Sequence, residues 1–126
     1  MSVNAAILEF AADLFAGLDG YSARRMFGAA GLYADGVMFG LIDDDRIYLK
    51  TDEALKAELI AAGSETWIYT ERKGPKADKP QETSYWSLPE SACDDPDEAC
   101  AWGRKALAVA LAAKAEKPAR RPPRSP

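Results

Sequence analysis

The chain has 126 residues and a formal net charge of −4, and this length fits a single domain with a hydrophobic core. It contains no histidine, which excludes Ser-His-Asp and Cys-His catalysis and histidine metal ligands. Residues 116–126 carry a net charge of +3, which leaves −7 on residues 1–115. An acidic body opposes general DNA binding, because the phosphate backbone attracts clustered positive charge, but it leaves room for a local basic patch.

The two cysteines, Cys93 and Cys100, form neither a disulfide framework nor a zinc site by themselves. The first residues lack the basic segment of a signal peptide, and no apolar run approaches the length of a membrane span. We therefore expect reduced thiols in a cytoplasmic protein without a cofactor and without membrane association.

Three helices are predicted in chain order. Apolar residues at helical spacing predict the first over residues 3–19, and Gly20 suits its C-terminal end. The second begins at residues 51–53, which offer a plausible cap and an acidic first turn. The third begins at Asp95-Pro96 and runs to about Lys114, because proline and acidic residues favour a first helical turn. Gly103 inside this helix costs about 1 kcal/mol relative to alanine unless it packs closely.

Between the first two helices the sequence predicts a meander of three antiparallel strands. The pair Asp35-Gly36 suits a two-residue type I′ turn, which places Tyr33 opposite Met38 and Gly31 opposite Gly40. A turn over residues 43–45 leads to the third strand at 46–50. Two further strands are predicted at residues 65–70 and 83–88.

Alternation along the meander separates its side chains into two faces. The expected core face carries Leu32, Val37, Phe39, Leu41, Ile47 and Leu49. The expected outer face carries Tyr33, Met38 and Tyr48 around Gly31 and Gly40.

The predicted fold class is α+β, in the order helix, three-strand meander, helix, two strands, helix, with the helices on one face of a mainly antiparallel sheet. We expect a folded domain over residues 1–115. Residues 116–126 are expected to form a disordered basic tail rich in proline and arginine.

Several phrases, in order, resemble the N-terminal domain of the TfoX/Sxy competence-regulator family: RRMFG, GLY, GVMFGLI, YLK, YTERKG and SYWSLP. The resemblance covers about residues 8–112 and identifies the chain as a single-domain member. It implies a fold similar to secretion-chaperone-like α+β domains. It also implies a role related to transcriptional co-regulators of DNA-uptake genes, which work with the cyclic-AMP receptor protein. It implies no catalytic residues.

Two surface features have alternative interpretations. The outer face around Tyr33, Met38 and Tyr48 is either a partner or dimer surface or simple cross-strand packing. The loop that carries Arg72, Lys73, Lys76 and Lys79, extended by Arg24, either contacts phosphate or an acidic partner or is a solvated run of charge. For Asp43-Asp44-Asp45, a polar turn is favoured over a divalent-cation site.

We therefore hypothesise a non-enzymatic regulatory domain that acts by protein–protein contact. Its partner would be a transcription factor or a second copy of the chain, and contact with nucleic acid would be indirect. The alternative is a direct nucleic-acid binder that uses the basic loop 72–79 and the C-terminal tail. An acid–base enzyme is a third hypothesis, but no arrangement of residues in the sequence supports it.

Overall fold

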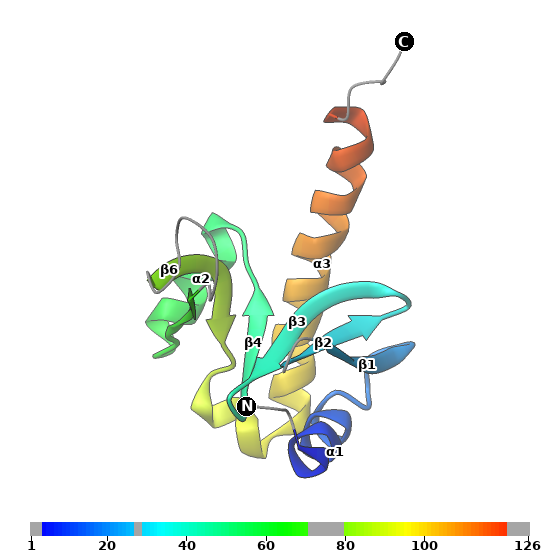
Figure 1. The fold of residues 1–126 in the computed structure, drawn as a ribbon, viewed down its shortest axis with the longest axis vertical. Helices are drawn as coiled ribbons and strands as arrows, with labels where there is room; N and C mark the ends of the chain where they lie inside the picture. The colour runs from blue at the N-terminus through cyan, green and yellow to red at the C-terminus, as the bar shows by residue number, and fades with distance from the viewer. Residues whose placement is uncertain (1–3, 27–28, 71–79, 121–126) are drawn as a thin grey trace.

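A computed structural model describes residues 4–26, 29–70 and 80–120 (Figure 1). The elements in chain order are α1 (Ala5–Leu14), β1 (Tyr21–Met26), β2 (Ala29–Ala34), β3 (Val37–Asp43), β4 (Arg46–Lys50), α2 (Glu53–Ala61), β5 (Thr66–Thr70), β6 (Pro80–Ser87), the short 3-10 helix η1 (Glu90–Asp94) and α3 (Pro96–Arg120). The strands form one antiparallel sheet in the order β1-β2-β3-β4-β6-β5. The predicted α+β class is confirmed, and β1 adds a strand to the predicted order.

Side-chain caps fix where the helices begin. The carboxylate or amide oxygens of Asn4, Asp52 and Asp95 accept hydrogen bonds from backbone N–H groups in the first turns of α1, α2 and α3. Such caps satisfy N–H groups that have no partner within the helix. At its other end α3 continues to Arg120. The first five residues of the expected disordered tail are therefore helical, and 121–126 lie outside the described residues.

The three helices pack on one face of the sheet, where they bury a continuous core. Figure 1 shows α3 running behind β3, with its C-terminal end projecting past the sheet. Phe15 and Phe39 are fully buried and meet edge to face, with ring centroids 5.3 Å apart. A Cβ on Gly103 would lie 3.1–3.3 Å from atoms of Leu18 and Phe15. Gly103 therefore packs closely. Close packing is what the sequence requires if a glycine inside α3 is not to destabilise the helix.

The turn between β2 and β3 forms as predicted, but the register behind it shifts by one residue. Asp35 and Gly36 have φ angles of 51° and 81°, and Tyr33 pairs with Met38. The next pair is Leu32 with Gly40, so Phe39 is an extra residue in β3. The predicted facing of Gly31 and Gly40 is therefore wrong, because a β-bulge places two residues of one strand opposite one residue of the other. Gly31 pairs with Leu41 instead.

The turn between β3 and β4 is one residue shorter than predicted. Asp44 and Asp45 alone form it, with φ angles of 53° and 61°, and Asp43 pairs with Arg46. Leu41 consequently pairs with Tyr48. Because cross-strand partners share a face, Leu41 lies on the outer face and not on the predicted core face. Ile42, which is fully buried, takes its place in the core.

Gly40 is required where β3 approaches β4. A Cβ at this position would lie 2.6 Å from the Tyr48 carbonyl oxygen, which is a backbone atom. We expect Gly40→Ala to lower the free energy of unfolding by about 2–3 kcal/mol, because the strands must move apart to relieve the overlap. Urea unfolding measures this change.

Gly36→Ala is the matched control, because a Cβ at Gly36 meets open space. Its positive φ alone should cost about 1–2 kcal/mol. An unchanged unfolding midpoint for Gly40→Ala would contradict the close approach of the two strands.

The hydroxyl of Tyr21 is buried and has no hydrogen-bond partner among the described residues. Burial raises its pKa from 10.0 to about 12. We expect Tyr21→Phe to stabilise the fold by about 1 kcal/mol at neutral pH, because it removes an unsatisfied polar group. Because the pKa of Tyr21 is higher in the folded state than in the unfolded state, Tyr21 ionises first in the unfolded state. The wild-type protein therefore loses stability as the pH rises above 10. The advantage of Tyr21→Phe should therefore grow between pH 10 and 12, which urea titrations at several pH values would measure; an equal decline in both proteins would contradict it.

Candidate interaction surface

The outer face of the sheet lies opposite the helix-covered core, and strand register decides which residues reach it. The pairs Tyr33–Met38, Leu41–Tyr48 and Lys50–Tyr85 each share this face. Arg24 joins them from β1, because its guanidinium lies over the Tyr33 ring at 5.6 Å. We call these residues of β1, β2, β3, β4 and β6 the outer face.

Aromatic rings and cations contact one another across the outer face. The Trp67 ring lies 6.2 Å from that of Tyr48 and 6.0 Å from that of Tyr85. Its indole N–H donates to Asp43 at 2.9 Å. The Lys50 ammonium lies 5.5 Å from the centre of the Tyr85 ring, a distance typical of a cation–π contact. These contacts hold positive charges on the outer face of an acidic domain.

Four of the five residues predicted for a partner surface lie on the outer face, but they differ in exposure. Tyr33 and Met38 form a cross-strand pair and are partly exposed. Tyr48 is only 7% exposed, so it supports its neighbours and offers little surface to a partner. Gly31 pairs with Leu41. Gly40 faces the core between the side chains of Leu32 and Leu49, because the bulge turns it away from the outer face.

The sheet divides at one end of the outer face. Pairing between β3 and β4 ends at Gly40–Leu49, although β3 begins three residues earlier at Val37. The pocket that results has a volume of about 340 Å³ and includes residues from the β2–β3 hairpin, β4, β6 and α3. We call it the split pocket, and its walls include Tyr33, Met38, Lys50, Tyr85, Ala113 and Lys114.

Sequence reasoning missed Lys50, Tyr85 and Lys114 as parts of this surface. Alternation with Tyr48 places Lys50 on the outer face and was a usable signal. The position of Tyr85 could not be predicted in this way, because only the pairing of β6 with β4 brings it beside Lys50. The position of Lys114 depends on how α3 crosses the sheet, and the sequence of α3 does not specify this crossing.

The predicted basic patch is described only in part. Arg72, Lys73, Lys76 and Lys79 lie outside the described residues. Arg24 lies on the outer face, and its neighbour in β1, Arg25, alternates to the other face. One of the two arginines therefore belongs to the outer face, as the alternation of a strand requires.

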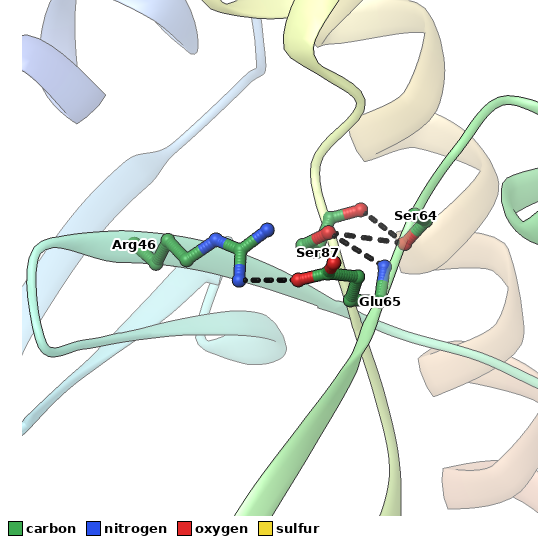
Figure 2. A network of polar contacts seen from close by, with 4 residues as sticks. All are labelled: Arg46, Ser64, Glu65 and Ser87. Carbon is green, nitrogen blue, oxygen red and sulfur yellow. Dashed lines mark hydrogen bonds and ion pairs between the residues drawn. The ribbon is translucent and has the colours of Figure 1, made fainter.

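A second hollow, of about 380 Å³, lies between α1, the β3–β4 turn, β6 and η1, and includes Arg46, Glu65, Ser87 and Cys93. Figure 2 shows how its polar groups satisfy one another. Ser64 donates to the Ser87 carbonyl oxygen at 2.6 Å, and the Glu65 N–H donates to Ser87 Oγ at 3.0 Å. Arg46 donates to Glu65 at 2.9 Å. The Ser64 proton is used and Ser87 is held by backbone groups, so this network joins strands and activates no nucleophile.

Neither cysteine has the surroundings of a reactive thiol. Burial, together with Asp94 and Glu90, raises the pKa of the Cys93 thiol, and a thiol that stays protonated is a poor nucleophile. Cys100 is buried in the core and donates to the Leu14 carbonyl oxygen. Within the described part of the chain, no group of three Asp, Glu or Cys side chains is placed to hold a metal ion.

A family model described as the TfoX N-terminal domain matches residues 13–110. The chain belongs to the TfoX N-terminal domain family. It is therefore a competence-regulator-like domain of a regulatory family. A search of curated proteins found no match. None of the helices in the described ranges of this TfoX domain is long and apolar enough to cross a membrane.

Ser87 joins β6 to the segment before β5 in the TfoX domain. Ser87→Ala removes the acceptor of the part-buried Glu65 N–H and the partner of Ser64. We expect the free energy of unfolding to fall by about 1–3 kcal/mol, because a part-buried donor loses its partner. Ser91→Ala is the control, since Ser91 bonds to Glu98 at an exposed position. Equal effects of the two substitutions on thermal unfolding would contradict the structural role of the Ser87 network.

Proposed function

We propose that this TfoX N-terminal domain is a non-enzymatic regulatory domain that binds an acidic segment of a partner protein on its outer face. The observation that carries the proposal is the set of cations held over partly exposed aromatic rings, Arg24 over Tyr33 and Lys50 over Tyr85. Aromatic side chains and arginine are enriched in protein interfaces. An acidic partner complements these cations.

The charge of the domain supports the choice of partner. Residues 1–115 carry a net charge of −7, so positive groups on one face create a local field that differs from the rest of the surface. Local fields of this kind direct the approach of an oppositely charged partner and fix its orientation. The family supplies the regulatory context, and the partner is our inference.

Direct nucleic-acid binding is the second candidate. Aromatic rings beside cations also bind single strands by stacking and by contact with phosphates. The acidic body disfavours this function, because long-range repulsion opposes a polyanion. An acidic peptide segment needs fewer positive contacts than a nucleic acid strand does.

We expect a photo-crosslinking phenylalanine at position 38 to capture one protein through an acidic segment from nuclease-treated host extract. The same residue at position 57, an exposed alanine of α2, should not capture it. In the double variant Arg24→Glu/Lys50→Glu the yield should fall about tenfold, because two attractive contacts become repulsive. Mass spectrometry of the crosslinked peptide identifies the partner and its charge.

Three results would overturn the proposal. The first is equal capture from positions 38 and 57. The second is a crosslink between two copies of this chain. The third is a product that disappears with nuclease and, in the untreated extract, weakens steeply with salt, which would indicate nucleic acid.

A further inference from the structure

The split pocket exists because the sheet opens beside the bulge. A β-bulge bends its strand and increases the local twist. Phe39 is the extra residue, and β3 loses its pairing with β4 directly before Gly40. The β2–β3 hairpin thus diverges from β4. Helix α3 passes close to the opening, where Ala110 and Ala113 contribute to the pocket wall. Small side chains on this part of α3 leave the space open.

The polar groups of the split pocket have one sign of charge. Lys50 and Lys114 bring two ammonium groups, and Tyr33 and Tyr85 bring two phenol groups. No carboxylate is among its wall residues. Among the described residues, neither lysine forms an ion pair. The pocket therefore offers donors and positive charge without a carboxylate of its own to neutralise that charge.

The remaining walls are apolar. Val37 and Met38 close one side, and the alanines of α3 close the other. Ligand sites commonly combine an apolar lining with a few convergent polar groups that fix the orientation of the ligand. A volume of about 340 Å³ is at the small end of the range for such sites, about 300–1,000 Å³. An anionic head with an apolar body fits this arrangement better than inorganic phosphate, which has no apolar part.

We propose that the split pocket binds a carboxylate carried on an apolar body, such as the C-terminal residue of a protein or a small organic acid. The carboxylate accepts hydrogen bonds from Lys50, Lys114 and the tyrosine hydroxyls, and the apolar body lies between Met38 and Ala113. This inference deepens the proposed function, since the pocket lies at one end of the outer face.

N-acetylphenylalanine is the probe, and its C-terminal amide is the matched control ligand. Titration into the full chain, followed by amide NMR spectra, should move the signals of residues that border the pocket. The acid should bind about tenfold more tightly than the amide, because only the acid makes charge-assisted hydrogen bonds. Equal affinity of the acid and the amide, or no shifts at these residues, overturns the proposal. Inorganic phosphate that competes as well as the acid also overturns it in favour of a general anion site.

Substitutions in the protein test the same site independently of the choice of ligand. Lys50→Gln and Lys114→Gln should each weaken binding of the acid about threefold, as expected for a partly exposed charge pair. Lys105→Gln is the control on α3, because Lys105 is paired with Glu58 outside the pocket. Ala113→Leu should abolish binding by filling the pocket, whereas Ala112→Leu, at the adjacent exposed position, should leave it unchanged. Equal effects of the two leucine variants would place the ligand elsewhere.

The source of the carboxylate is resolved by lengthening the probe. A tetrapeptide that ends in phenylalanine and binds about tenfold more tightly than N-acetylphenylalanine indicates a protein C-terminus, because it adds contacts along the outer face. Equal affinity indicates a small organic acid. The crosslinking experiment at position 38 fails or succeeds separately, since it measures protein capture and not carboxylate binding. Carboxylate binding without capture would leave the split pocket established and remove the partner protein.

Discussion

The extra residue in β3 is the constraint on which the rest of the arrangement depends. Because Phe39 has no partner in β2, Met38 stays on the outer face with Tyr33 while Gly40 turns toward the core with Leu32. Phe39 itself is fully buried against Phe15 and Tyr21. One inserted residue thus gives the core its central aromatic contact and opens the sheet at the same point.

The bulge is compatible with a tight sheet only because of the residue that follows it. Gly40 brings β3 so near to β4 that no side chain fits against the Tyr48 carbonyl oxygen. Past this contact the pairing of the two strands stops, and Val37 and Met38 of β3 pair with β2 alone. Close approach on one side of Gly40 and separation on the other have the same origin, which is the local twist that a bulge adds.

The parts of the fold that were predictable from sequence are those set by neighbouring residues. Asp35-Gly36 specified its turn, Asp95-Pro96 specified the start of α3, and the close packing condition at Gly103 was met. The bulge was not predictable, because Phe39 continues the apolar alternation and gives no sign that it is an extra residue. A single shift in register moves side chains to the other face, and for this reason Gly40 and Leu41 were placed wrongly.

The candidate site was predictable to the extent that it lies within one hairpin. Tyr33 and Met38 face each other across a two-residue turn, and their pairing follows from local chemistry. Tyr85 and Lys114 reach the same place through contacts between segments distant in the chain, and no local pattern encodes such contacts. Lys50 was predictable in part, since alternation along β4 predicted which face it lies on but not which residues lie beside it.

The hollow beside Ser87 and the split pocket differ in how their polar groups are paired. In the hollow beside Ser87, the Ser64 hydroxyl, the Glu65 N–H and the Arg46 guanidinium each donate to an acceptor of the protein. Such a network joins elements and has little left to offer a ligand. In the split pocket, two ammonium groups and two phenols face a space without a carboxylate. Because a protein gains from satisfying its polar groups, the split pocket is the hollow where we propose that a second molecule binds.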